Sequence, residues 1–285
     1  MDKADPSDYA ADMEQHFTPS GVRLRKHSAR AGELNWLLLP GGPGIGSESL
    51  IELADCLRVP GPVWLVDLPG DGSNRAAPGM TDDPFAKWPQ VLVEAAQALP
   101  NAVFVGHSTG GMYLLATPEL DGLVRGIALL DTAPDCKWHP RFVEMAARHP
   151  LPAVEAATEL YERDRRDENI AAIAVASAEW NFTPAGAEAG RELLARMPYN
   201  SAAVDWSEDN FDHIYEAAWW PSAVPVLVLA GAEDRIVWQG GWDDQRFRSP
   251  NALFRKVADA GHFPWIENPA AVSAAFDELA ARIAA

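Results

Sequence analysis

The chain has 285 residues, of which 48% are hydrophobic and 22% charged, a composition typical of a globular protein with a sizeable core. Its formal net charge of −18 argues against nucleic acid and anionic membranes as partners, because phosphate groups need a basic surface. The cysteines, Cys56 and Cys136, form neither a disulfide framework nor a metal-binding cluster. No signal peptide and no membrane-spanning apolar run is visible, which predicts a cytoplasmic protein.

In chain order, residues 1–14 are expected to form a tail or a short helix. Apolar runs then recur at intervals and alternate with amphipathic segments, predicted as helices at 48–58, 84–98, 110–118 and 269–284. Strands followed by helices predict a mostly parallel central sheet with helices on both faces. The predicted strands are Val22–Lys26, Leu34–Leu39, Val63–Val66, Val103–Val105, Ile127–Leu130, Val226–Ala230 and Leu253–Val257.

Residues 133–221 contain no convincing strand and are rich in Ala, Glu and Arg. This pattern predicts several helices inserted between two strands of the sheet. We therefore expect an α/β core formed by residues 1–132 and 222–285, with residues 133–221 as a helical cap, or lid, over the strand ends.

Residues 106–110 read G-H-S-T-G, a G-x-S-x-G pattern directly after a predicted buried strand and before a predicted helix. On such a strand-to-helix turn the serine hydroxyl is pushed out of the fold, and the flanking glycines let two backbone segments approach closely. This context makes Ser108 the candidate nucleophile. The alternative is an ordinary glycine-rich turn with an incidental serine.

A serine nucleophile needs a base, and the base needs an acid to orient it. Asp234 follows the strand 226–230, and His262 follows the strand 253–257, so both are expected at the carboxyl edge of the sheet. The chain order Ser108, Asp234, His262 is that of α/β-hydrolases. Asp131, which also ends a predicted strand, is the main rival for the acid.

The oxyanion of an acyl-transfer intermediate needs two N–H donors. One is expected from Thr109, directly after the serine, and the other from the loop that follows an early strand. That loop reads P-G-G-P-G-I-G over residues 40–46, and Gly42 is the predicted donor. A nucleotide-binding function for this loop is disfavoured, because the sequence lacks a following Lys-Ser or Lys-Thr and a true G-x-G-x-x-G.

From about residue 20 to 283 the chain resembles the α/β-hydrolase family. Residues 66–73 (V-D-L-P-G-D-G-S) resemble the family's D-L-P-G-H-G-x-S loop, with Asp71 where the family usually has histidine. Residues 40–44 resemble the H-G-G-P-G loop of proline iminopeptidase-like members, with Pro40 in place of histidine, and residues 261–269 also resemble that branch. The G-H-S-T-G turn at residues 106–110, the nucleophile elbow of this family, is in contrast similar to those of esterases and cofactor-free haloperoxidase-type hydrolases.

The resemblance implies a Ser108–His262–Asp234 triad with Gly42 and Thr109 as the oxyanion hole. Nothing in the sequence calls for a metal or an organic cofactor. The predicted function is hydrolysis of a small-molecule ester or lactone. A proline iminopeptidase-like aminopeptidase and a non-catalytic ligand-binding protein on a hydrolase scaffold are the alternatives.

The region 133–221 leaves two questions about the substrate open. Two interpretations of its tryptophans are open: they could line an acyl pocket, or they could pack the helices onto the sheet. We favour the second. Two interpretations of its acidic cluster are also open: the carboxylates could bind a substrate ammonium, or they could form a solvated face. We favour the solvated face, because runs of charged residues are usually exposed. The tryptophans are Trp138, Trp180, Trp206, Trp219 and Trp220, and the acidic residues are Asp205, Glu208, Asp209 and Asp212.

Overall fold

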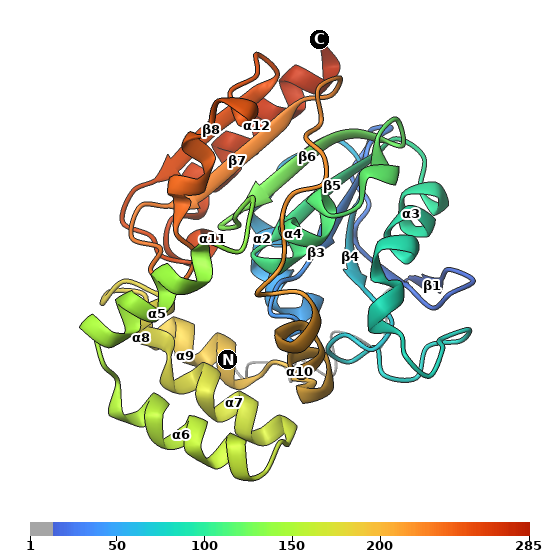
Figure 1. Ribbon diagram of the computed structural model, residues 1–285. Helices are drawn as coiled ribbons and strands as arrows, with labels where there is room; N and C mark the ends of the chain where they lie inside the picture. Colours follow the sequence, from blue (N-terminus) through green and yellow to red (C-terminus); the bar gives the residue numbers. More distant parts are fainter. Residues whose placement is uncertain (1–13) are drawn as a thin grey trace, which may run out of the picture.

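The computed structural model describes residues 14–285, and the predicted tail, residues 1–14, lies almost entirely outside this range. An eight-stranded sheet forms the centre, in the order β1-β2-β4-β3-β5-β6-β7-β8 (Figure 1). Strands β3 to β8 run parallel, whereas β1 and β2 pair antiparallel at one edge. The strands are β1 Gln15–Phe17, β2 Arg23–Ser28, β3 Asn35–Leu39, β4 Val63–Asp67, β5 Ala102–His107, β6 Val124–Leu130, β7 Val226–Gly231 and β8 Ala252–Val257.

Every strand predicted from an apolar run is present, with its ends shifted by a few residues at most. Strand β1 is not among the predicted strands; it is three residues long and largely exposed at the sheet edge. None of the described helices is long and apolar enough to cross a membrane.

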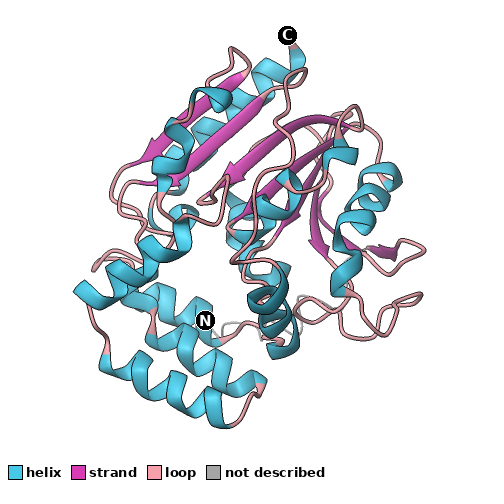
Figure 2. Ribbon diagram, viewed as in Figure 1, coloured by secondary structure: helices cyan, strands magenta, loops and turns pink. Residues whose placement is uncertain are grey.

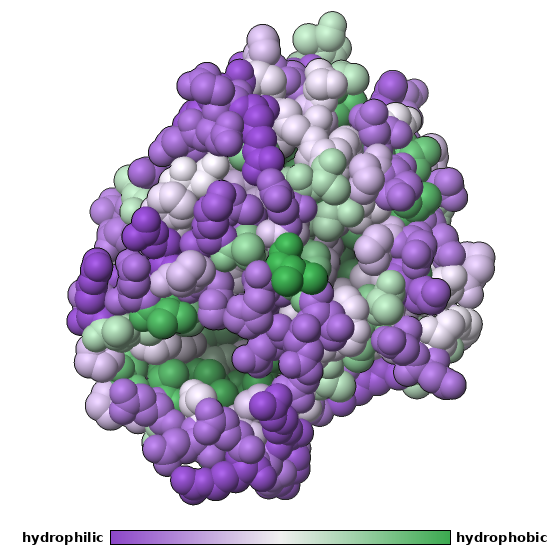
Figure 3. Space-filling view, viewed as in Figure 1, coloured by the Kyte–Doolittle hydropathy of each residue, from purple (hydrophilic) through white to green (hydrophobic). Residues whose placement is uncertain are grey.

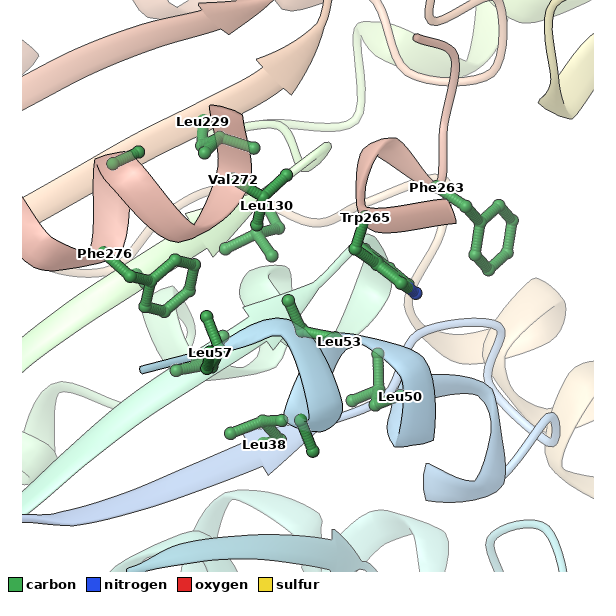
Figure 4. Packing of buried hydrophobic residues seen from close by; sticks show 14 of the residues in the cluster. Leu38, Leu50, Leu53, Leu57, Leu130, Leu229, Phe263, Trp265, Val272 and Phe276 are labelled. Atoms are coloured by element: carbon green, nitrogen blue, oxygen red, sulfur yellow. The ribbon is translucent and has the colours of Figure 1, made fainter. Parts of the chain in front are cut away.

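Alternate residues of the central strands point to opposite faces of the sheet, and each face carries its own hydrophobic core. Trp36 and Leu38 of β3 belong to one core, whereas Leu37 and Leu39 belong to the other. The first core packs under α2 (Ile51–Cys56), α11 (Pro264–Glu267) and α12 (Pro269–Ala284), as Figure 4 shows for Leu53, Trp265 and Phe276. The second core packs under α3 (Trp88–Ala98) and α4 (Thr109–Leu115).

Short 3-10 helices complete this α/β part of the chain. They are η1 Ser47–Leu50, η2 Phe85–Lys87, η3 Pro118–Leu120, η4 Gln239–Asp243 and η5 Gln245–Phe247. Parallel strands with both faces covered by helices confirm the predicted mostly parallel α/β architecture.

Between β6 and β7 the chain forms helices, which lie together beyond the carboxyl ends of the parallel strands (Figures 1 and 2). Within residues 133–221, all of which the structure describes, the β-type pairing is limited to an isolated bridge between Asp135 and Glu216. These helices are α5 Trp138–Arg148, α6 Pro152–Arg163, α7 Asp167–Ala176, α8 Ala178–Asn181, α9 Ala187–Ala195 and α10 Ser201–Asn210.

Candidate active site

Ser108 lies on the sharp turn between β5 and α4. Its backbone angles, φ 50° and ψ −126°, fall in a region that residues with a side chain rarely adopt. Glycines make this turn possible, because a Cβ on Gly106 would lie only 2.6 Å from the Cα of Gly111. A Cβ on Gly41 would lie 2.6 Å from the Cβ of Ser108. The strained turn and its close neighbours therefore fix the position of the serine.

Asp234 and His262 come together from separate loops, after β7 and β8. Nδ1 of His262 lies 3.2 Å from both Oδ1 and Oδ2 of Asp234. The Asp234 carboxylate is fixed by the backbone N–H groups of Ile236 and Val237, which donate to Oδ1 at 2.8 and 3.2 Å. The His262 backbone N–H donates to the carbonyl oxygen of Asn181, at 2.7 Å. Both members of the pair are thus held by the backbone around them.

Ser108 and His262 face the same cavity. Within the described chain no hydrogen bond joins Ser108 Oγ to the His262 ring. Catalytic hydrogen bonds of this kind are often long in ligand-free enzymes and shorten when substrate binds. The arrangement therefore brings the predicted nucleophile, base and acid to one place.

Asp131, the rival acid, lies beside this pair. Side-chain ligand atoms of Asp131, Asp234 and His262 all lie within 4.8 Å of one another. The Asp131 Oδ1 accepts the N–H of Gly231 at 2.8 Å. Burial and the nearby charge of Asp234 raise the pKa of Asp131 well above its usual value. The neutral form of Asp131 is therefore favoured, and Asp234 is the carboxyl that contacts the histidine.

His107 supports the histidine loop from behind. Its Nε2 lies 2.9 Å from the backbone carbonyl oxygen of His262, and since a carbonyl only accepts, this nitrogen carries the proton. Burial, and then the neighbouring His262, lower the pKa of His107 well below its usual range. The neutral form of His107 is therefore favoured, and its ring anchors the backbone of His262, the candidate base.

The two predicted oxyanion donors belong to segments that are bonded to each other. Thr109 is the first residue of α4, where backbone N–H groups have no partner within the helix. The Thr109 hydroxyl donates to the carbonyl oxygen of Gly42 at 3.2 Å. Gly42 has φ 108°, a conformation that favours glycine. This contact holds the glycine-rich loop against the start of α4, next to Ser108.

The cavity beside Ser108 has a volume of about 270 Å³ and is mainly apolar. In Figure 3 the surface is hollowed near α7, and hydrophobic side chains gather there. Among its lining residues within the described chain there is no Asp, Glu, Lys or Arg. The segment between β6 and β7 supplies much of the wall, through Ile170, Ile173, Ala174, Ser177, Asn181, Leu194, Tyr199 and Val204.

A model of the alpha/beta hydrolase family matches residues 36–275. The chain belongs to this family. It is 26% identical to the pimeloyl-[acyl-carrier protein] methyl ester esterase of Xanthomonas oryzae pv. oryzae (strain MAFF 311018) over 234 residues, which cover 77% of this chain and 84% of the relative. It is also 26% identical over 275 residues to the protein of the same name from Xylella fastidiosa (strain M12), and this match covers 87% of this chain and 95% of the relative.

Two solved structures show the same fold. The proline iminopeptidase-related protein from Thermus thermophilus superposes with a TM-score of 0.72 at 23% identity, covering 95% of this chain and 98% of the other. A thermophilic esterase from Thermogutta terrifontis gives a TM-score of 0.63 at 21% identity, covering 96% and 99%. The predicted α/β-hydrolase fold and the general class, a hydrolase with esterase relatives, are therefore confirmed.

None of the five tryptophans between residues 133 and 221 is among the described residues that line the cavity. The Trp180 indole donates to the carbonyl of His149, and that of Trp219 donates to Leu114. Trp206 contacts the rings of Phe85 and Trp88.

The acidic cluster lies away from the cavity wall too. Asp205 pairs with Arg165 at 2.8 Å and accepts the Tyr161 hydroxyl. Asp212 accepts the Ser207 hydroxyl at 2.9 Å. Asp205 and Asp212 therefore have partners within the protein, whereas Glu208 and Asp209 are exposed. None of the four is among the described residues that line the cavity.

Two groups of functional residues were not predicted. Ile170, Ile173 and Ala174 of α7 line the cavity with the i, i+3, i+4 spacing of one helix face, a signal that was present in the sequence. Glu267 belongs to residues 261–269, which carry the family resemblance, but no role is predicted for it. Its carboxylate accepts the N–H of Gly261 at 2.7 Å and both the N–H and the hydroxyl of Thr183, which ties the histidine loop to the segment after α8.

Proposed function

We propose that this α/β hydrolase cleaves esters that carry an uncharged, apolar acyl group, through a Ser108–His262–Asp234 triad. The observation that supports it best is the meeting of the elbow serine with the His262–Asp234 pair at one apolar cavity. The named esterase relatives point to the same reaction class.

In the proposed mechanism His262, oriented by Asp234, takes the proton of Ser108 as the serine attacks the ester carbonyl. The carbonyl oxygen becomes an oxyanion, which the backbone N–H groups of Gly42 and Thr109 stabilise. His262 then gives the proton to the leaving alcohol, and an acyl-enzyme remains. Water repeats the sequence, with His262 again as base, and releases the acid and free Ser108.

The cavity wall supports the choice of substrate. A charged group on the substrate would lose its water in this cavity without gaining a counter-ion, because the described part of the wall has no Asp, Glu, Lys or Arg. An aminopeptidase needs a carboxylate for the substrate ammonium, so this alternative is weaker. The wall formed by α7, α9 and α10 also supports residues 133–221 as a cap over the core formed by residues 1–132 and 222–285. A lactone with an apolar ring would fit the same chemistry, and a cytoplasmic location stays a prediction from the sequence.

The test is hydrolysis of p-nitrophenyl butanoate by the wild type and by Ser108→Ala. Loss of the nucleophile is expected to lower turnover about 10⁶-fold, by comparison with other serine hydrolases. Ser177→Ala is the matched control, because Ser177 is another serine of the same cavity. It is expected to keep turnover within about tenfold, the equivalent of 1.4 kcal/mol. Equal activity of Ser108→Ala and wild type would refute the assignment.

The two alternative functions are tested on the same protein. An amino-terminal proline anilide, assayed beside the ester, is expected to be cleaved far more slowly, and a preference for it would favour the aminopeptidase. A non-catalytic binding protein would leave Ser108 unlabelled by a fluorophosphonate probe, whereas a hydrolase forms a covalent adduct there.

A further inference from the structure

Asp71 occupies the position at which the D-L-P-G-H-G-x-S loop of the resembled family has histidine, and the proposed mechanism does not use it. It lies in the loop after β4 and is only 2% exposed. Its Oδ1 accepts the backbone N–H of Gly44 at 2.8 Å. Gly44 is two residues beyond Gly42, so this carboxyl group holds the loop that carries a proposed oxyanion donor.

Gly44 also bonds to the segment that begins α10. Its carbonyl oxygen accepts the N–H of Asn200 at 2.8 Å, and Asn200 begins α10 as its N-cap. The Asn200 side chain in turn donates to the carbonyl of Gly70, beside Asp71. Gly44 has φ 89°, and a Cβ there would lie 2.5 Å from the carbonyl oxygen of Asn200. Since Tyr199 lines the cavity, one chain of hydrogen bonds joins Asp71, the oxyanion loop and the cavity wall.

The surroundings of Asp71 favour its neutral form. Asp67 at the end of β4 and Glu48 on η1 add negative charge near Asp71. Tyr113 on α4 is another titratable group close to Asp71. Two arginines of β2 lie nearby, but they are already paired with Asp67 and Glu48. Burial, and then the charge of Asp67, raise the pKa of Asp71 to about 8.

We propose that Asp71 is a positioning residue that works as a neutral acid: it fixes the oxyanion loop through Gly44 without placing a negative charge beside the developing oxyanion. Ionisation of Asp71 keeps the hydrogen bond to Gly44 but adds such a charge, which disfavours the tetrahedral intermediate and lowers turnover. Substrate binding in the apolar cavity is affected much less. The inference rests on the proposed esterase function.

The experiment measures kcat and KM for p-nitrophenyl butanoate between pH 6 and pH 9.5. Asp71→Asn keeps the shape and the acceptor oxygen but has no titrating proton, and Asp71→Ala removes the acceptor. Asp212→Asn is the matched control, because Asp212 is also a largely buried carboxyl whose pKa is raised by burial, but its partner is Ser207 and it is outside the cavity wall.

For the wild type, and for Asp212→Asn, kcat is expected to fall about tenfold between pH 7 and pH 9, as one group passes from mostly neutral to mostly charged. Asp71→Asn is expected to match the wild-type kcat at pH 7 and to keep it at pH 9. Asp71→Ala is expected to lose at least about tenfold in kcat at pH 7 with little change in KM, a loss smaller than the 10²–10³ of a missing donor.

An alkaline fall in Asp71→Asn equal to that of the wild type overturns the proposal, and so does a wild-type kcat with no such fall. If Asp71→Ala does not fold, the pH profile of Asp71→Asn decides alone. Failure of the proposed function is a separate outcome, because it appears as ester hydrolysis that survives Ser108→Ala at every pH.

Discussion

Enlarging one side chain of the cavity wall is expected to shorten the acyl chain that the enzyme prefers. Ala174 on α7 lines the cavity, and Ala174→Leu adds three carbons to a space of about 270 Å³. Each buried CH₂ of an acyl chain contributes about 0.8 kcal/mol, or about fourfold in kcat/KM, until the space is full. Loss of the space for three CH₂ groups of the acyl chain corresponds to about 2.4 kcal/mol, which lowers kcat/KM for a long ester about 60-fold.

The assay compares kcat/KM for the p-nitrophenyl acetate, butanoate, hexanoate and octanoate esters. Ala172→Leu is the matched control, since it makes the same substitution on an exposed position of the same helix. We expect Ala174→Leu to lose activity on the long esters while the acetate changes little, and Ala172→Leu to keep the wild-type profile. A chain-length profile in Ala174→Leu identical to that of the wild type would refute the assignment of this cavity to the acyl group.

Other expectations concern the acid, the serine turn and the effect of pH on stability. Asp234→Asn is expected to lower kcat/KM about 10⁴-fold, as in other triads, whereas Asp131→Asn retains most of it, and the reverse order would make Asp131 the acid. Gly41→Ala places a Cβ 2.6 Å from that of the nucleophile, so it should lose activity, whereas Gly122→Ala, with nothing within 4 Å of its Cβ, costs only about 1 kcal/mol of backbone strain and keeps activity. The folded pKa of Asp71, raised to about 8, lies above its usual 3.8, so its contribution to stability is present below pH 3.8 and is lost progressively as the pH rises through 8. Urea unfolding should therefore show Asp71→Asn gaining on the wild type between pH 5 and pH 9, and a constant difference would contradict the buried neutral acid.

The sheet could be predicted from the sequence because its strands are buried on both faces and read as continuous apolar runs, such as Val226–Gly231. Strand β1 could not, because an exposed edge strand of three residues has no such signal. The candidate residues Ser108, Asp234 and His262 could be located for the same reason: each follows a buried strand, and parallel strands end at one edge.

The cavity wall and the role of Asp71 depend on packing between segments far apart in the chain. The apolar face of α7 is visible in the sequence, but only the structure shows that Ile170, Ile173 and Ala174 line the same cavity as Ser108. Asp71 departs visibly from the family motif, but its contact with Gly44 joins residues 27 positions apart, and no local sequence pattern indicates that contact. The chain order already favours Asp234 over Asp131 as the acid, and the 3.2 Å contacts between Asp234 and His262 support that choice.

The most direct test of the proposed catalytic serine is covalent labelling with a fluorophosphonate, followed by peptide mass spectrometry and an activity assay on the same sample. The account predicts one adduct per chain, on the peptide at Ser108, with esterase activity falling in proportion to labelling and no adduct in Ser108→Ala. Full activity in a completely labelled protein, or an adduct on another residue that accounts for the loss, would contradict it.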